Sequence, residues 1–329
     1  MTSATTSREY SGIRAVVLGA SGFIGRWVSR MLSDSGADLH APVRSPGEAR
    51  RVFRAYGIQG VVYEADLADL EGTRRLLVRL GPAVVFNLSG YGVDPGEKTE
   101  ASDRLAGVLN VELPGVIAET LTTIPAGHWG GRRVIHAGSV FEYGNIGGHL
   151  AETAAANPVG LYGRSKLAGT HRLTAACRAT GLPGLTARLC QVYGPGEHPG
   201  RLLPDLIEAR HHARPLSLSV GTQRKDFTYV ADVAEGLLRL GLTAGPPGEV
   251  VNLATGRLAM VREFVEVAAH LLRLDASRLK FEKPIPDNEL QHLEVAIDRL
   301  RELTCWEPAT DVAEGIRRTL DFLDRTSNG

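Results

Sequence analysis

The sequence predicts an α/β fold in which a doubly wound parallel sheet is joined to a smaller mixed α/β domain. Two observations lead to this prediction. In the first half of the chain, short apolar runs alternate with longer segments of helical period, which is typical of a parallel sheet covered by helices on both faces. After Leu189 the alternation stops, and mixed short elements follow to the end of the 329 residues, a length that suits one large and one small domain.

Each element of the expected sheet is visible as a separate run. Strands are expected at residues 15–18, 39–43, 61–63, 84–88, 134–137 and 185–189. Helices are expected between them at residues 23–35, 48–55, 70–80, 106–121 and 162–180. Because crossovers between parallel strands are right-handed, the carboxyl ends of these strands should share one edge of the sheet, where ligands bind.

The second half of the chain is expected to build most of the smaller domain. Helices are expected near residues 203–211, 230–240, 262–272 and 312–324. We predict a dinucleotide-binding domain over residues 12–190, joined by a returning segment at about 227–255. Residues 191–226 and 256–329 would then form a substrate-binding domain. The first eleven residues are polar and are predicted to be a loose tail.

Charge and cysteine usage restrict the partners. Lys+Arg and Asp+Glu both number 37, so the net charge of zero gives no electrostatic footprint for nucleic acid or an anionic membrane. We find no secretory signal, and no run that approaches the ~20 apolar residues of a membrane span. Cys177, Cys190 and Cys305 are far apart, which favours reduced thiols in a cytoplasm over disulfides or a metal site.

A glycine-rich turn follows the first expected strand and runs into the first helix. Its Gly-x-x-Gly-x-x-Gly pattern lets the backbone turn sharply and approach a pyrophosphate, while the helix N-terminus offers free N–H groups and a partial positive charge. The turn predicts a Rossmann-type dinucleotide site, and an ordinary tight turn is the alternative. The residues expected at the cofactor are Gly19, Ser21, Gly22, Phe23, Ile24 and Gly25.

The residue after the second expected strand bears on the choice of cofactor. A carboxylate there binds the ribose diol of NAD, whereas a cation favours the extra phosphate of NADP. Arg44 stands there, and its planar fork suits a phosphate, so NADP(H) is favoured while NAD(H) stays open. A solvated surface arginine is the alternative. Asp66, after the third strand, could bind the adenine amino group or cap the next helix.

The catalytic candidates are a tyrosine, a lysine and a serine. Tyr162 and Lys166 lie four residues apart on an expected helix, so their side chains share a face. A fixed ammonium should lower the pKa of the phenol, and Tyr162 could then exchange a proton with a carbonyl oxygen while hydride moves. Ser139 ends the fifth expected strand, where its hydroxyl could share the developing charge or only bond the local backbone.

These residues together resemble the extended short-chain dehydrogenase/reductase family, which includes epimerases, dehydratases and 4-ketoreductases of nucleotide sugars. The resemblance covers nearly the whole chain after the tail. It implies that Ser139, Tyr162 and Lys166 form the catalytic triad, and that Tyr162 and Lys166 also contact the cofactor. Further matching segments are Asp66-Leu67 at the adenine, Asn87-Leu88-Ser89-Gly90 beside the cofactor, Asn110-Val111-Glu112, Arg188 to Pro195, Lys225 to Asp232, and Trp306-Glu307-Pro308.

Departures from the family pattern narrow the implied activity. Val140 and Phe141 replace the Asp-Glu pair that follows the catalytic hydroxyl in 4,6-dehydratases, and Phe141 also replaces the cysteine of the GDP-fucose synthase type. The run from Val43 to Pro46 resembles NADPH-using dihydroflavonol reductases, whereas 4-epimerases usually carry an acidic residue there. What remains is NADPH-dependent reduction of the 4-keto group of a nucleotide-linked 6-deoxy sugar. Residues 288–292 are faintly similar to GDP- and CDP-linked 4-keto-6-deoxyhexose reductases.

The resemblance also implies substrate contacts and a partner. Gln191 stands where the family has asparagine, and Lys225 stands where it has a diphosphate-contacting arginine. Arg201 could be a second phosphate contact or a surface arginine. The candidate substrate-binding residues are Tyr91, Asn110, Val140, Gln191, Arg201 and Lys225. A homodimer with a four-helix interface, built from residues 106–121 and 162–180, is also implied.

Three rival activities stay open at this stage. The first is a nucleotide-sugar 4-epimerase that keeps NAD or NADP bound and returns it to its starting oxidation state. The second is a reductase of a non-sugar ketone. The third is a non-catalytic sensor of the cofactor, but the intact Ser139, Tyr162 and Lys166 argue against it, because a sensor needs no proton-transfer set.

Overall fold

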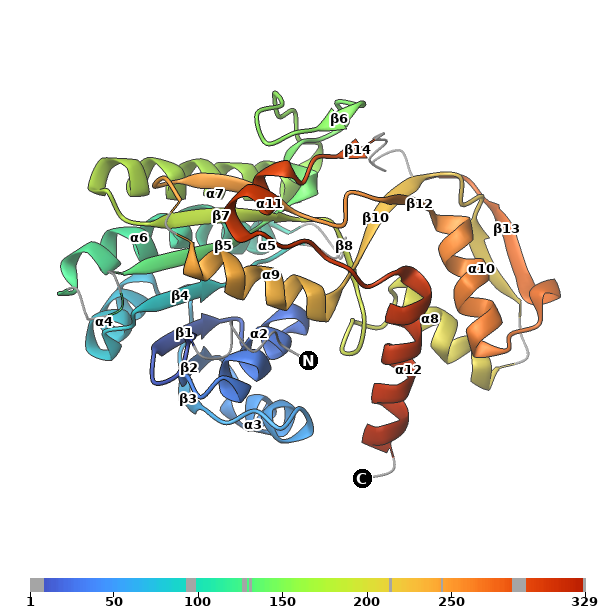
Figure 1. The fold of residues 1–329 in the computed structure, drawn as a ribbon, viewed down its shortest axis with the longest axis horizontal. Coiled ribbons are helices and arrows are strands. Elements are labelled where there is room, and N and C mark those ends of the chain that lie inside the picture. Colours follow the sequence, from blue (N-terminus) through green and yellow to red (C-terminus); the bar gives the residue numbers. More distant parts are fainter. Residues whose placement is uncertain are drawn as a thin grey trace.

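The computed structural model describes residues 9–92, 99–125, 129, 132–212, 215–243, 245–285 and 294–327. A large parallel sheet lies between two layers of helices, and a smaller region of short strands and helices lies beside it (Figure 1). The strands of the large sheet are β1 (Arg14–Leu18), β2 (Asp38–Val43), β3 (Val61–Glu64), β4 (Val84–Asn87), β5 (Arg133–Ser139), β7 (Gly184–Leu189) and β11 (Glu249–Leu253).

The strand order is β11-β7-β5-β4-β1-β2-β3, and every neighbouring pair is parallel. The predicted α/β class and all six expected strands are therefore confirmed. The seventh strand, β11, was not expected as a strand. Its sequence Glu-Val-Val-Asn-Leu places two polar residues in a short apolar run, and the buried Asn252 uses its amide to bind the carbonyl oxygens of Leu150 and Ala296.

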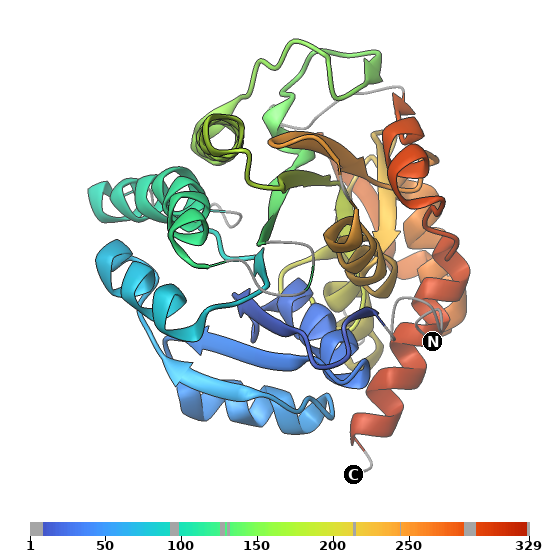
Figure 2. The same ribbon diagram turned by 60° about the vertical axis from the view of Figure 1, so that its left-hand side comes forward.

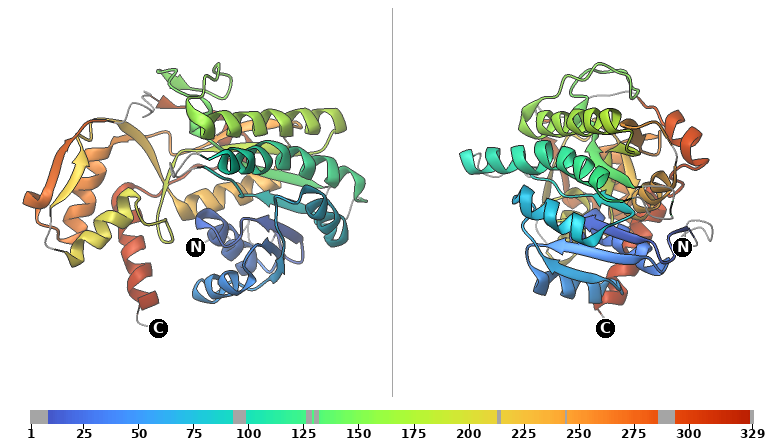
Figure 3. Two further views of the ribbon diagram at one scale, coloured as in Figure 1. Left: turned by 180° about the vertical axis from the view of Figure 1, so that it is seen from behind. Right: turned by 90° about the vertical axis from the view of Figure 1, so that its left-hand side faces the viewer.

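Helices cover both faces of the sheet because side chains alternate along each strand. In β1, Ala15 and Val17 enter one core, whereas Val16 and Leu18 enter the other. Figures 2 and 3 show the two helical layers from other sides. The first core is covered by α2 (Phe23–Asp34), α3 (Pro46–Ala55) and α9 (Val230–Leu242), and the second by α4 (Leu70–Leu80), α6 (Leu113–Thr123) and α7 (Gly160–Thr180).

The helix expected at residues 106–121 is longer and is not uniform. It consists of α5 (Glu100–Ala106), a π-helical turn η1 (Gly107–Glu112) and α6 in direct succession. By length and composition the stretch Glu100–Thr123 could cross a membrane, which corrects the expectation that no segment approaches that character. Leu113, Ile117 and Leu121 enter the core beside α4 and α7, so the apolar composition has a packing role in this fold.

The smaller region contains three short sheets and most of the remaining helices. Its sheets join β8 (Gln191–Tyr193) and β12 (Leu258–Met260) to β10 (Arg224–Tyr229), β9 (Leu216–Ser219) to β13 (Leu279–Lys283), and β6 (His149–Leu150) to β14 (Glu294–Val295). Its helices are α8 (Leu202–Glu208), α10 (Val261–Leu272) and α12 (Val312–Ser327), with single turns η3 (Ala209–His211) and η4 (Ala276–Arg278). The helix α11 (Asp298–Thr304) packs on β11 and α9 of the large sheet, and the turn η2 (Val140–Glu142) directly follows β5. The rings of Phe227 and Phe264 stack with centroids 4.3 Å apart and bind β10 to α10.

Two expectations at the ends of the chain need comment. Tyr10 was predicted to belong to a loose tail, but it is fully buried, and its hydroxyl donates to the carbonyl oxygen of Leu238 at 2.7 Å. The tail prediction is therefore wrong for this residue, because a single aromatic ring gains enough burial against Phe86 and Trp129 to order its segment. Residues 288–292 lie outside the described residues.

Candidate active site

The glycine turn between β1 and α2 has a geometry that only glycine permits. Gly19 has a φ of +82°, and a Cβ there would come within 2.9 Å of the backbone of Leu88. A Cβ on Gly25 would lie 1.9 Å from the carbonyl oxygen of Gly19. Gly22 is the N-cap of α2 and provides no side chain to its first amides. The turn thus brings a helix N-terminus and bare backbone together, a cradle that fits the pyrophosphate of a dinucleotide.

The two residues expected at the far end of the cofactor are exposed. Arg44 directly follows β2, and its guanidinium makes no hydrogen bond or ion pair with any residue that the structure describes. Asp66 follows β3, and one carboxylate oxygen accepts from the amide of Ala68 at 2.9 Å. The helix cap is Asp69, which accepts from Gly72 at 2.8 Å. The alternative that Asp66 caps the helix is therefore wrong.

The segment after β4 is held by one asparagine. The Oδ1 of Asn110 accepts from the amide of Tyr91 at 2.9 Å, and its Nδ2 donates to the carbonyl oxygen of Tyr91 at 2.8 Å and to Ser165 at 2.9 Å. Asn110 is fully buried, and these bonds hold the backbone of Tyr91 in place. Contact of Asn110 with a substrate stays a prediction.

Ser139 and Tyr162 meet at the carboxyl end of β5. Ser139 is the last residue of β5 and the N-cap of η2, while Tyr162 lies in the first turn of α7. Burial raises the pKa of Tyr162 to about 12, and its hydrogen bond to Ser139 and the charge of Arg201 offset this only in part. The ring of Phe141 stands edge-on to the phenol, with centroids 5.9 Å apart. The phenol is thus a protonated group in a mostly apolar setting.

Lys166 is buried one helical turn after Tyr162. Its Nζ donates to the carbonyl oxygen of Ala137 at 2.5 Å and lies 3.4 Å from Nε2 of His136. Burial lowers the pKa of Lys166 to about 8, against the raising effect of Glu142. The expectation that Lys166 lowers the pKa of Tyr162 is therefore wrong for this structure, because burial of the phenol outweighs it and the ammonium is turned toward β5.

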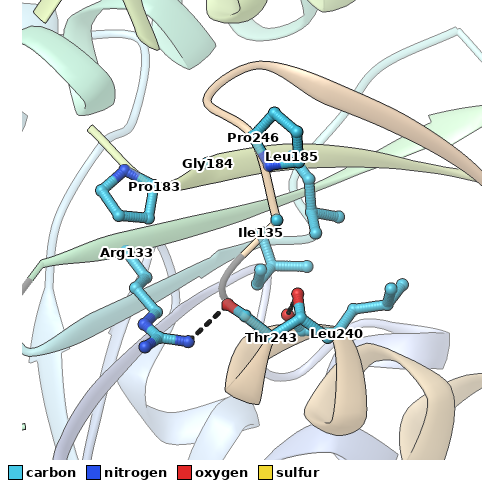
Figure 4. A pocket seen from close by; sticks show the side chains of 9 residues that line it. Arg133, Ile135, Pro183, Gly184, Leu185, Leu240, Thr243 and Pro246 are labelled. Atoms are coloured by element: carbon cyan, nitrogen blue, oxygen red, sulfur yellow. Dashed lines mark hydrogen bonds between the residues drawn. The ribbon is translucent and has the colours of Figure 1, made fainter. Parts of the chain in front are cut away.

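The remaining candidate substrate residues come from the end of β5 and from the smaller region. Val140 is buried directly after Ser139, and Gln191 begins β8 beside Phe227 of β10. Lys225 lies on β10 and is half-buried. Arg201 is the N-cap residue of α8, and its charge lowers the pKa of Tyr162. A separate hollow, drawn in Figure 4 with Arg133, Pro183 and Thr243 in its lining, lies at the opposite edge, where β5 and β7 begin.

Comparison with known proteins agrees with this geometry. Residues 15–254 match the model of the NAD dependent epimerase/dehydratase family, which spans most of the chain. The chain belongs to this family. The matched range runs from the first residues of β1 to the end of β11, so it includes the glycine turn and the Ser139, Tyr162 and Lys166 group.

Two curated relatives in this family match almost from end to end. One is a dTDP-6-deoxy-L-talose 4-dehydrogenase (NAD(P)+) of Kitasatospora kifunensis, 29% identical over 95% of this chain and 96% of the relative. The other is a UDP-glucose 4-epimerase of Mycolicibacterium smegmatis, 27% identical over 96% of this chain and 100% of the relative. A solved epimerase structure from Methanothermobacter thermautotrophicus superposes with a TM-score of 0.83 at 21% identity and covers 98% of this chain and 96% of that one.

The candidate active site also contains a buried ion pair, between Glu142 and Arg188, that the sequence did not predict. Glu142 is fully buried and accepts from the amide of Ser139 at 2.9 Å, from Thr170 at 3.0 Å and from Nε of Arg188 at 2.9 Å. The Arg188 guanidinium lies 4.3 Å from the ring centroid of Tyr143. The sequence did offer a signal for this pair. Glu142 lies three residues after Ser139, beside Val140 and Phe141, and a charged side chain buried in such an apolar segment needs a partner of opposite charge.

Glu197, in the loop between β8 and α8, is a second carboxyl that the sequence did not predict. Burial raises the pKa of Glu197 to about 8, and Arg201 and the amide of Gly194 lower it only in part. Its Oε2 is buried without a partner among the described residues. The same loop touches the start of α2, because the indole N–H of Trp27 donates to the carbonyl oxygen of Pro195 at 2.9 Å. This contact connects the loop after β8 to the helix of the cofactor turn.

Proposed function

We propose that the protein uses NADPH to reduce the 4-keto group of a nucleotide-linked 6-deoxy sugar, with Tyr162 as proton donor. The observation that carries the proposal is the position of Tyr162 beside Ser139 at the carboxyl end of β5. Burial raises the pKa of the phenol to about 12, so Tyr162 holds the proton that a reduction requires at neutral pH. Val140 and Phe141, beside Ser139, offer no carboxyl or thiol for elimination or for epimerisation next to the ketone.

The named activity of one relative supports the same position on the sugar. The protein of Kitasatospora kifunensis is named for dehydrogenation at carbon 4 of a 6-deoxy sugar with NAD(P)+. Oxidation of a 4-hydroxyl and reduction of a 4-ketone are one reaction read in two directions, and they use the same acid/base group. A 6-deoxy sugar linked to a nucleotide is therefore the proposed substrate class of this chain.

The proposed mechanism assigns one task to each member of the catalytic group. NADPH, when held at the glycine turn, would supply the hydride for the carbonyl carbon. Tyr162 gives its phenolic proton to the carbonyl oxygen, so that C=O becomes CH–OH and a phenolate remains to be reprotonated from solvent. The Ser139 hydroxyl donates to the same oxygen and shares its developing charge. Lys166, whose ammonium is turned toward β5, would contact the cofactor rather than the phenol.

We assign the cofactor to the glycine turn and to the exposed positions after β2, β3 and β4. Arg44 would hold the 2′-phosphate of NADP, and its guanidinium has no partner among the described residues. Asp66 and Leu67 would contact the adenine. Leu88, Ser89 and Gly90 would line the central part of the cofactor. The absence of a carboxylate next to Arg44 at the end of β2 favours NADP over NAD.

We assign the substrate to the region between the sheet edge and the smaller region. Lys225 and Arg201 would hold the diphosphate, while Tyr91, Val140 and Gln191 would line the sugar. Residues 12–190 and about 227–255 would form the cofactor domain, and residues 191–226 and 256–329 the substrate domain. A second copy packed on α6 and α7 would complete a four-helix dimer interface.

A 4-epimerase is the second candidate. It is favoured by the full-length similarity to the UDP-glucose 4-epimerase of Mycolicibacterium smegmatis. An epimerase would keep its cofactor through purification and would return it to its starting oxidation state after each turnover. A reductase would release the oxidised cofactor and bind a fresh molecule of NADPH.

The proposal is tested with a panel of 4-keto-6-deoxyhexoses linked to dTDP, GDP, CDP or UDP. The assay follows consumption of NADPH with each compound, and Tyr162→Phe is the control for chemistry at the site. We expect at least one compound to be reduced, and Tyr162→Phe to lose about 10²–10⁴-fold in kcat while binding NADPH normally. Epimerisation of a UDP-hexose without any reduction across the panel would contradict the proposal.

A further inference from the structure

His136 is a buried imidazole that the proposed mechanism does not use. It lies in β5, three residues before Ser139, and has no exposed surface. In the parallel ladder it is paired with Asn87 of β4, and across the second face of the sheet it meets Lys166 of α7. A fully buried polar ring in the middle of a strand needs partners at both nitrogens, and here both partners belong to the candidate site.

The contacts form one continuous chain of side chains. Nε2 of His136 lies 3.4 Å from Nζ of Lys166, at the long end of hydrogen-bonding distances. Nδ1 of His136 lies 3.1 Å from the amide of Asn87. The other end of that amide lies 2.6 Å from the hydroxyl of Ser89, in the segment assigned to the cofactor. Lys166 is thus connected, across the neighbouring strands β5 and β4, to Ser89.

The position of the hydrogen on the His136 ring follows from these contacts. Burial and the charge of Lys166 lower the pKa of His136 well below its ordinary value, so the ring is neutral, with one N–H and one acceptor nitrogen. When Lys166 is an ammonium, Nε2 must accept from it. In the structure the amide nitrogen of Asn87 faces Nδ1, and the amide oxygen accepts from the hydroxyl of Ser89. An ammonium at Lys166 requires the reversed amide, in which Nδ1 donates to the oxygen of Asn87 and the amide nitrogen donates to Ser89; exchanging the two amide atoms keeps the same heavy-atom distances.

Two of the three N–H groups of the Lys166 ammonium therefore have acceptors within the protein. One goes to the carbonyl oxygen of Ala137, and one goes to His136. The other groups that face Lys166 are Glu142 of η2, which is the charge acting on it, and Tyr162 one turn earlier on the same helix face. Because two N–H groups of Lys166 are directed at Ala137 and His136 of β5, its third N–H points away from the sheet.

We propose that His136, oriented by Asn87, is a positioning residue that fixes the ammonium of Lys166 so that its third N–H is presented to the cofactor. The inference rests on the proposed role of Lys166 at the nicotinamide site, and not on the identity of the sugar. It holds equally for a reductase and for an epimerase, because both need the lysine beside the cofactor.

The test uses two neutral replacements of similar size in the full-length protein. In His136→Gln the amide reaches the position of Nε2 and can still meet Lys166, whereas in His136→Asn it reaches only the position of Nδ1 and leaves Lys166 without that partner. We expect His136→Gln to bind NADP+ within about threefold of the native protein. We expect His136→Asn to bind about tenfold more weakly, as for loss of one charge-assisted hydrogen bond. Calorimetric titration with NADP+ needs no sugar, so failure of the proposed reaction leaves this test intact.

A structural role for His136 predicts a different result. Equal weakening in both variants, with the same fall in melting temperature, would overturn the proposal, and so would unchanged binding in both. Asn87→Asp gives an independent test in a folded protein, because a carboxylate fixes the hydrogen on Nδ1 and keeps Nε2 accepting. We expect Lys166 then to hold its proton to higher pH, so that the alkaline loss of NADP+ affinity moves up by at least about one pH unit. An unmoved alkaline limit would contradict the proposal.

Discussion

Removal of the Glu142 carboxylate should strongly destabilise the protein. Glu142→Ala takes the acceptor from the amide of Ser139, the hydroxyl of Thr170 and the guanidinium of Arg188, all within 3.0 Å of it. Both charged side chains are at least 95% buried, so the guanidinium would be left in the core without its counter-charge. Loss of one partner of a buried ion pair destabilises a protein by about 3–5 kcal/mol, a large part of the ~5–15 kcal/mol that holds a typical domain folded.

The assay is urea unfolding followed by circular dichroism, with the free energy of unfolding taken from the midpoint and slope. Glu119→Ala is the matched control, because Glu119 pairs with Arg172 at 3.4 Å on the surface and should change stability by no more than about 1 kcal/mol. The double variant Glu142→Leu with Arg188→Met removes both charges. It should lose clearly less than Glu142→Ala, since no buried charge is left alone. A double variant that loses as much as the single one would refute the reasoning.

Three further predictions concern the cofactor site and the acid/base group. Gly25→Ala places a Cβ 1.9 Å from the carbonyl oxygen of Gly19 and should weaken NADP+ binding by at least about tenfold. The control Gly107→Ala, where a Cβ meets open space, should leave NADP+ binding unchanged. Calorimetric titration with NADP+ measures the affinity of both variants. Arg44→Ala should weaken NADPH by about tenfold and NADH by less than about twofold, and equal losses would remove the phosphate role. The reduction rate should be constant at neutral pH and fall as pH rises through about 8, where Lys166 loses its proton; a rate that stays constant up to the ordinary pKa of lysine would contradict this.

The sequence predicted the fold best where a short run of residues by itself determines the structure that it forms. The six expected strands are short runs of three to five residues between helical segments, and the structure has all six in one sheet. The glycine turn could be predicted because its backbone geometry excludes other residues at Gly19 and Gly25. The Ser139, Tyr162 and Lys166 group could be predicted in position, since strand ends and helix faces follow from spacing alone.

The features that the sequence did not predict depend on contacts between distant segments. Glu142 and Arg188 are 46 positions apart, and neither residue type by itself indicates a buried pair. The direction of Lys166 depends on where β5 presents His136 and the carbonyl of Ala137, so the expected effect on Tyr162 could not be judged from their four-residue spacing. Asn110 matched a family segment, but only the structure shows that its amide is used by the backbone of Tyr91.

The path of the hydride tests the central claim most directly. The protein is incubated with a nucleotide-linked 4-keto-6-deoxyhexose and NADPH that carries deuterium at the transferable position of the nicotinamide. The account predicts that one deuterium appears at carbon 4 of the sugar for each NADPH oxidised, and that the label is lost from the product when Tyr162→Phe replaces the native protein. Recovery of the 4-keto sugar and NADPH unchanged, together with inversion at carbon 4 of a UDP-hexose given in a parallel incubation and without deuterium in that product, would contradict the account and would identify an epimerase.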